Sequence, residues 1–216
     1  MKIQASAILA SVLAASLLPT ASAGIVTDAQ NDLFDNGLSN LDITQVNISD
    51  DGTNLSIAVT TRGFQTWTKY MLYLDTASGG TTSNGWNRPV NLTSSIEYYI
   101  GSWVDASSNN AQFWSWSGSW SQTGTFTNAV SGNTVTFTMS LASLGLSAGS
   151  TMYFDVATSG GGNDPGVDHL SRSDMATSGW GSPSTSGNFL SYTVTPAPGA
   201  LALLGVAGIV GARRRR

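Results

Sequence analysis

The feature that most constrains this fold is a series of short runs in which apolar and polar residues alternate. Leu55, Ile57 and Val59 alternate with polar partners, and Tyr70, Leu72 and Leu74 are spaced to form one face of another strand. Stretches rich in Gly, Asn, Asp and Ser separate the runs, and residues 50–54 join two of them as a hairpin turn would. A period of two places alternate side chains on one face of a β-strand. The chain therefore predicts antiparallel sheets rather than helices.

This pattern predicts about ten strands over about 150 residues, as in an antiparallel β-sandwich. Residues 141–146 are expected to form a single helical turn. We therefore predict an all-β fold: one antiparallel sandwich of jelly-roll or immunoglobulin-like type over residues 24–195. The expected strands are residues 43–48, 55–59, 70–74, 96–100, 113–116, 120–122, 126–130, 135–139, 152–156 and 190–194.

The N-terminus predicts export from the cytoplasm. Lys2 precedes an apolar run over residues 5–18, and the segment ends in the small residues Ala21, Ser22 and Ala23. This is the order of a secretory signal peptide, so signal peptidase is expected to leave a mature chain that begins at Gly24. The chain contains no cysteine. A body of about 170 residues needs no disulfide, because it can bury about two-thirds of its unfolded surface in one core.

The charge of the body excludes one class of partner. Between residues 24 and 195, four cations stand against thirteen acids, which gives a net charge of −9. No basic patch is present to neutralise phosphates, so we expect no nucleic-acid partner. Twelve of the thirteen acids are Asp, a residue that favours turns and oxygen-rich cation sites.

The C-terminus combines three features in a fixed order. A Pro-Ala-Pro box formed by Pro196 and Pro198 precedes an apolar stretch of fourteen residues, 199–212, and the chain ends in an arginine cluster. The stretch is short of the roughly twenty residues that cross a bilayer untilted, and the arginines would be held on the cytoplasmic side. The cluster consists of Arg213, Arg214, Arg215 and Arg216.

This order resembles the PEP-CTERM sorting signal of exported bacterial proteins, although Ala197 stands where the usual box has Glu. The resemblance implies recognition by an exosortase-type membrane transpeptidase, after transient insertion in the inner membrane. It further implies removal of the tail near residues 196–198 and delivery to the cell surface or extracellular matrix of a Gram-negative-type bacterium, as in a biofilm. The alternative is that the tail is retained as a weak membrane anchor.

Four of the seven tryptophans lie close together in the sequence. Trp114 and Trp116 are two residues apart, so they share one face of a strand, and the turn at 117–119 could place Trp120 opposite Trp116. With Trp103, they could form a platform on which sugar rings stack. On this hypothesis, Trp114→Ala or Trp120→Ala weakens polysaccharide retention and leaves the fold intact. The alternative is that these side chains fill the core.

Several short motifs resemble the layout of DOMON-like domains and of family 9 carbohydrate-binding modules. The resemblance implies an extracellular ligand-binding sandwich, often for saccharides, with structural calcium in some members. The motifs are Leu41-Asp42-Ile43, the run from Asp50 to Leu55, the run from Tyr70 to Asp75, the run from Glu97 to Gly101, and Val167-Asp168-His169-Leu170.

Calcium is the ion that the sequence favours. Asp28, Asp32 and Asp35 crowd the first loop of the mature chain, and Asp164 and Asp168 crowd a later one. Carboxylate oxygens suit a hard cation, although such clusters also occur as simple turns. The absence of Cys and the single His disfavour zinc.

Enzymatic motifs are weak in this chain. Residues 145–149 match G-x-S-x-G, and His169 follows, but a turn before a strand is the wrong context for a nucleophile elbow. Glu97 is the single Glu, and nothing selects a pair of catalytic carboxylates. We therefore expect a non-catalytic surface or matrix protein that binds polysaccharide or other envelope components. The alternative is an extracellular carbohydrate-active enzyme or its binding module.

Overall fold

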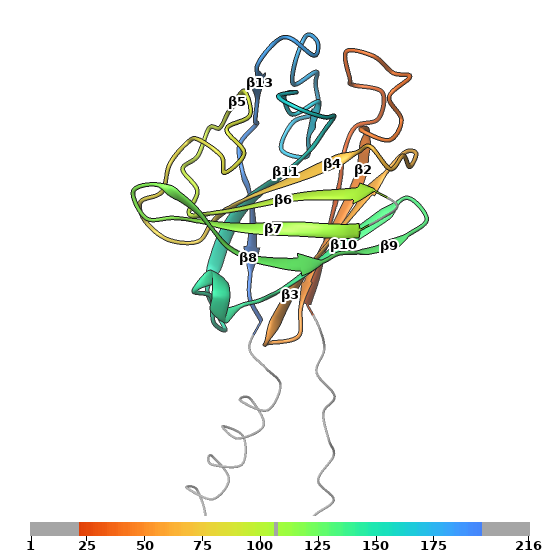
Figure 1. Cartoon of the computed structure of the whole chain (residues 1–216). Helices are drawn as coiled ribbons and strands as arrows, with labels where there is room; N and C mark the ends of the chain where they lie inside the picture. Colours follow the sequence, from red (N-terminus) through yellow and green to blue (C-terminus); the bar gives the residue numbers. More distant parts are fainter. Residues whose placement is uncertain (1–21, 106–107, 196–216) are drawn as a thin grey trace, which may run out of the picture. The chain divides into compact units, whose positions relative to one another are not determined.

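The computed structural model describes residues 22–105 and 108–195, which belong to one compact unit, Ala21–Pro196. Fourteen strands and one short 3₁₀ helix make up its regular structure (Figure 1). In chain order these are β1 (Ser22–Thr27), β2 (Ile43–Asp50), β3 (Asn54–Thr61), β4 (Lys69–Asp75), β5 (Val90–Asn91), β6 (Tyr98–Asp105), β7 (Ser108–Trp116), β8 (Trp120–Thr127), β9 (Ala129–Ser131), β10 (Thr134–Ser140), η1 (Ala142–Leu144), β11 (Thr151–Ser159), β12 (Asp168–His169), β13 (Ser184–Thr185) and β14 (Leu190–Thr193).

The strands form two antiparallel sheets that pack as a sandwich. The smaller sheet has the order β1-β2-β3-β10-β9. The larger has the order β12-β11-β4-β6-β7-β8, and β14 also pairs with β11. A short parallel pair, β5 with β13, joins two loops. The all-β prediction is confirmed, and every expected strand overlaps an observed one.

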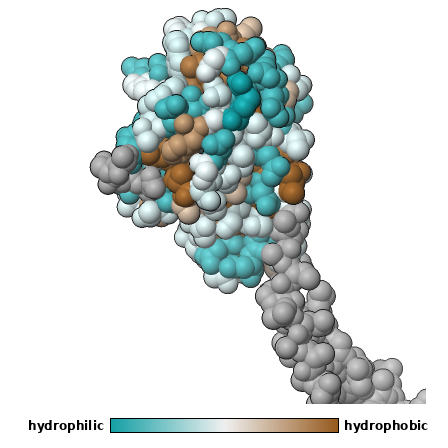
Figure 2. Space-filling model, turned by 90° about the vertical axis from the view of Figure 1, so that its right-hand side faces the viewer, coloured by the Kyte–Doolittle hydropathy of each residue, from teal (hydrophilic) through white to brown (hydrophobic). Residues whose placement is uncertain are grey.

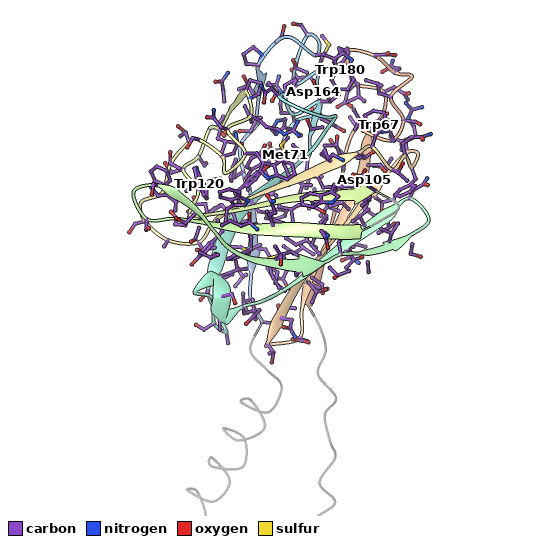
Figure 3. The ribbon with its side chains drawn as sticks, in the orientation of Figure 1. Trp67, Met71, Asp105, Trp120, Asp164 and Trp180 are labelled. Atoms are coloured by element: carbon purple, nitrogen blue, oxygen red, sulfur yellow. The ribbon has the colours of Figure 1, made fainter. Side chains whose placement is uncertain are left out.

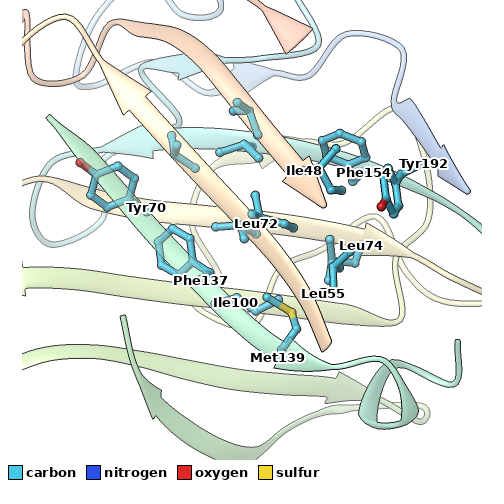
Figure 4. Close-up of a cluster of buried hydrophobic side chains, with 14 of the residues drawn as sticks. Ile48, Leu55, Tyr70, Leu72, Leu74, Ile100, Phe137, Met139, Phe154 and Tyr192 are labelled. Carbon is cyan, nitrogen blue, oxygen red and sulfur yellow. The ribbon is translucent and has the colours of Figure 1, made fainter. Parts of the chain in front are cut away.

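The main core lies between the two sheets. Tyr70 and Leu72 of β4 meet Phe137 of β10, and Ile100 and Phe154 extend the layer (Figure 4). All five side chains are fully buried. Burial of each large apolar side chain contributes about 1.5–3 kcal/mol. Alternation along the strands therefore produces the core that the sequence predicts.

The structure differs from the expected strands at two places. The strand β1 was not expected, and it pairs with β2 along its whole length. The expected strand 126–130 is interrupted at Asn128, whose buried side chain donates hydrogen bonds to Ser102 Oγ (2.5 Å) and Trp103 O (3.4 Å). Because the Asn128 side chain bonds to β6, the expected strand divides there into β8, which ends at Thr127, and β9, which begins at Ala129. The expected helical turn is confirmed as η1.

Two long loops, residues 76–97 and 160–189, cover part of the outer face of the larger sheet. Beneath them lies a second buried cluster that includes Met71, Tyr73 and Tyr99. Arg88 is buried there, and its Nη1 donates to Ser159 Oγ (2.9 Å) and to the Asp164 carbonyl (3.0 Å). These contacts tie the two loops to the sheet. On the side seen in Figure 2, hydrophobic residues form small separate groups among polar ones.

The two expected sorting segments lie almost wholly outside the described residues. Ala21, Pro196, Pro198 and the arginines at 213–216 belong to that part of the chain, whereas Ala23 is in β1 and pairs with Ser49. Cleavage after Ala23 would leave Gly24–Thr27 of the strand in place. Among the described residues, no helix is long and apolar enough to cross a membrane.

Candidate functional site

An acidic cluster lies where β1 ends and β2 begins. The two strands are antiparallel, so Asp28, directly after β1, lies at the start of β2, where its backbone N–H donates to the Thr44 carbonyl (3.1 Å); Asp42 directly precedes β2. Asp168 of β12 reaches the same place and accepts a hydrogen bond from the Ile43 backbone N–H (2.6 Å). One carboxylate oxygen from each of Asp32, Asp42 and Asp168 lies within 4.8 Å of the others. Three distant segments therefore bring carboxylates to one point.

Several oxygens of this cluster have no hydrogen-bond donor. Asp28 Oδ2, Asp42 Oδ1 and both carboxylate oxygens of Asp32 are buried and unpartnered. The remaining oxygens are occupied: Asp42 Oδ2 accepts from Arg62 Nε (2.8 Å) and from the Asn31 N–H (3.0 Å). Asn31 has a left-handed backbone conformation (φ 63°), which Asn adopts more readily than most residues. Buried anionic oxygens without donors are costly unless a cation neutralises them.

The pKa values of the clustered carboxyl groups also indicate a site that favours a cation. Burial, together with the charge of Asp168, raises the pKa of Asp28 to about 9. Burial raises the pKa of Asp168 well above its usual value and raises that of Asp32 as well, and neighbouring carboxylates add to each shift. Such shifts arise where several carboxylates share a site that lacks a counter-charge. Arg62 is the one cation in hydrogen-bond contact with the described cluster.

The structure thus unites three of the predicted calcium ligands and separates two. Asp28, Asp32 and Asp168 lie together, whereas Asp35 is exposed and caps its own turn through the Gly37 N–H (2.9 Å). The Asp164 carboxylate lies beside the Trp180 ring instead. Asp42 was missed as a candidate ligand, because its approach depends on pairing between β1 and β2. Oxygen donors of this kind fit Ca²⁺, which takes six to eight oxygen ligands.

The predicted tryptophan platform lies on the outer face of the larger sheet. Trp103, Trp114, Trp116 and Trp120 all point to this face, and the register pairs Trp116 with Trp120, as predicted. Their ring centroids are 5.6 Å apart. Each of the four side chains is partly buried.

Loop 76–97 packs on this tryptophan face. Trp86 lies over Gly101, where any Cβ would collide with its indole ring, and its Nε1 donates to Gln112 Oε1 (2.7 Å). Trp114 Nε1 donates to the same oxygen (3.1 Å), and Trp120 Nε1 donates to Ser83 Oγ (3.0 Å). Trp114 and Trp120 also pack against the second buried cluster. These contacts give the two rings a structural role in addition to any exposed surface.

The most exposed tryptophans lie elsewhere. Trp67 and Trp180 are each 39% exposed, and their ring centroids are 6.5 Å apart. Phe34 supports Trp180 edge-on at 5.4 Å. A side chain at Gly160 would collide with both the Asp164 carboxylate and the Trp180 ring, so these two groups lie together. Figure 3 shows Trp67, Trp180 and Asp164 in the upper part of the molecule and Trp120 at its left edge.

No local sequence pattern predicts this aromatic pair. Trp67 and Trp180 are more than a hundred residues apart, and each stands alone in a loop without an aromatic neighbour at strand spacing. The loop that carries Trp180 is braced locally, because Thr177 Oγ1 donates to the Ser182 carbonyl (2.9 Å) and Ser178 Oγ donates to Ser182 Oγ (2.9 Å). Trp180 therefore presents its aromatic surface from a braced loop.

A Ser-His-Asp arrangement occurs in the interior. His169 Nδ1 lies 2.7 Å from Asp155 Oδ2, and His169 Nε2 lies 3.2 Å from Ser184 Oγ. All three residues are fully buried, and the Gly166 N–H donates to Ser184 Oγ (3.1 Å). A substrate carbonyl would find no exposed surface at this hydroxyl. Ser147 of the G-x-S-x-G match lies in an exposed turn with Ser150 instead.

Comparisons with known proteins identify no family. No protein-family model matches the chain, and no curated protein matches its sequence.

Proposed function

We propose that this chain is exported and displayed at the cell surface or in the extracellular matrix, where it binds polysaccharide without catalysing a reaction. Export rests on the signal-peptide pattern at residues 1–23 and on the likeness of residues 196–216 to PEP-CTERM sorting signals. On this proposal, signal peptidase and an exosortase-type transpeptidase process the two ends. The sandwich is then the displayed part.

The observation that carries ligand binding is the exposed pair of Trp67 and Trp180 beside Asp164. Sugar rings present C–H faces that pack on indole, and a carboxylate accepts hydrogen bonds from their hydroxyls. The body carries a net charge of −9, which repels anionic polymers. We therefore propose a neutral polysaccharide as the ligand. The tryptophan face of β6, β7 and β8 is the alternative site for the same ligand.

We also propose that Ca²⁺ is held by Asp28, Asp32, Asp42 and Asp168. The support is the set of buried, donor-free oxygens at this point and the absence of sulfur and imidazole donors among them. Bound calcium would neutralise carboxylates that otherwise repel each other. Because β1, β2 and β12 all supply ligands, its role would be to fasten these elements together.

Polysaccharide binding is tested with residues 24–195 in affinity electrophoresis through gels that contain neutral glucans, xylan or mannan. Trp67→Ala and Trp180→Ala are each expected to weaken binding at least about tenfold, because aromatic anchors dominate such sites. Met175→Ala is the matched control, since Met175 is 49% exposed and lies in the same long loop. Thermal unfolding should stay unchanged in all three variants.

Two results of this experiment would change the assignment. Loss of binding in Trp116→Ala, with Trp67→Ala and Trp180→Ala unaffected, would move the site to the tryptophan face. Retention of binding in all three tryptophan variants, or no binding to any neutral polymer by the wild type, would contradict the proposal.

Export and sorting are tested by intact-mass spectrometry of the protein recovered from its own cell surface or medium. The proposal predicts a chain that begins at Gly24 and ends near residues 196–198, with or without an attached group. A mass that retains Arg213–Arg216 would contradict removal of the tail and would leave the weak-anchor alternative.

A further inference from the structure

We propose that two copies of this protein associate through the free edge of β8, so that the larger sheet continues from one copy into the other. This inference concerns assembly, and it does not depend on polysaccharide or calcium binding. In the larger sheet, β8 is the terminal strand and pairs with β7 alone among the described strands (Figure 1). Its eight residues are exposed or partly exposed along their whole length.

The strand β8 has neither the charged residues nor the Pro that usually protect a sheet edge; its one irregularity is a bulge at Thr123, where the register with β7 shifts. Natural edge strands are blunted by charged residues, especially Lys, or by Pro. The sequence of β8, WSQTGTFT, contains no charged residue and no Pro. Its unpaired backbone groups are therefore available to another strand.

The distribution of charge selects a second copy as the partner. The body carries a net charge of −9, so two copies repel each other through most of their surface. Between Asp105 and Asp155, however, the sequence contains no Asp, Glu, Lys, Arg or His. This neutral segment includes β7, β8, β9, β10 and η1. Two copies can approach through this side without placing like charges opposite each other.

A groove beside β8 strengthens the inference. Its volume is about 460 Å³, and it lies between β8 and the second half of β10. Phe113, Phe126 and Met139 give it an apolar lining. The groove exists because Gly124 contributes no side chain opposite Phe113 and because β9 covers only Thr134–Thr136 of β10. A strand added beside β8 would shield these side chains from water, which favours association.

The expected dimer is two-fold symmetric. Antiparallel pairing of β8 with its copy makes the same surface serve both partners, as in an isologous interface. Thr and Gln side chains of the two strands would lie across from each other, and Thr–Thr cross-strand pairs are favourable.

The test is sedimentation equilibrium of residues 24–195 over a range of concentrations. This segment contains all residues of the three buried clusters, which lie between Leu33 and Val194. The wild type is expected to reach twice the monomer mass. Thr125→Lys places a like charge at the exposed edge of both copies and is expected to raise the dissociation constant at least about tenfold.

Thr193→Lys is the matched control, because Thr193 is an exposed strand residue of β14 on the far side of β11. It should dimerise as the wild type does. Hydrogen exchange gives a second readout: the β8 amides should become protected as the wild-type concentration rises, and in Thr125→Lys they should not.

The proposal would be overturned by a wild type that stays monomeric at the highest soluble concentration. It would equally be overturned by a dimer that Thr125→Lys leaves intact, since another surface would then be in use. Protection of β8 amides only after a peptide or polysaccharide is added to a monomeric protein would assign the edge to that ligand instead.

Discussion

Removal of divalent cations from residues 24–195 is expected to lower the midpoint of thermal unfolding by about 10 °C. A ligand present at about a thousand times its dissociation constant stabilises the native state by about 4 kcal/mol. Each kcal/mol shifts the midpoint of a domain of this size by about 2–4 °C. Three carboxylates that converge on one point, with Asp28 beside them and several donor-free oxygens, are the source of this dependence. Thermal unfolding with excess calcium and with excess chelator measures it.

The effect of the cation should grow with pH. Without metal, the folded chain keeps Asp28 protonated up to a pKa of about 9, whereas the unfolded chain releases this proton near 3.8. The folded state then binds more protons, so its stability falls as pH rises from about 4 to about 9. Calcium requires the ionised carboxylates, and its affinity rises over the same range. The difference between the two midpoints should therefore widen from pH 5 to pH 8.

Asp32→Ala separates a calcium site from a simple acidic cluster. Both Asp32 carboxylate oxygens are without donors, so its removal costs no hydrogen bond and relieves repulsion with Asp42. The variant should lose the calcium-dependent rise in midpoint and should be no less stable than the wild type in chelator. Asp35→Ala is the matched control, because Asp35 is exposed and outside the cluster, and it should respond to calcium as the wild type does. A wild type indifferent to calcium and chelator would refute the site.

The strands could be predicted because their signal is local. Alternation at Leu55, Ile57 and Val59 identifies β3 whatever the rest of the chain does, and these three side chains are all in the main core. The strand β1 has a weaker signal, since it combines Gly24 with the exposed Ile25 and overlaps the expected signal-peptide end. It forms through its pairing with β2, which a local pattern does not reveal.

The candidate site was only partly predictable because its parts are brought together by long-range pairing. Asp28 and Asp32 are close in sequence, and their crowding suggested a cation site. Asp42 joins them only through the register of β1 with β2, and Asp168 only through β12. The same reason applies to Trp67 and Trp180. Short-range spacing found the tryptophan face of β7 and β8, which a single hairpin creates.

Asp155→Ala is expected to lower the free energy of unfolding by about 2–6 kcal/mol, because each of the two buried groups that it leaves without a partner costs about 1–3 kcal/mol. Asp155 is fully buried, and its Oδ2 lies 2.7 Å from His169 Nδ1. Its Oδ1 accepts from the backbone N–H groups of Val156 (2.8 Å) and Ser171 (3.0 Å). The Ala variant would leave the imidazole nitrogen and the Ser171 N–H without partners in the interior. Denaturant unfolding in the presence of calcium measures the loss.

Asp105→Ala is the matched control for this substitution, because its carboxylate is 49% exposed and pairs with Lys69 at 3.3 Å. An exposed ion pair contributes at most about 1 kcal/mol, so this variant should remain close to the wild type. Asp155→Asn keeps one acceptor oxygen and should recover part of the stability lost in Asp155→Ala. Since His169 adjoins Asp168 in β12, the Ala variant should also bind calcium more weakly. Equal stability of Asp155→Ala and Asp105→Ala would show that the buried pair does not hold β12 in place.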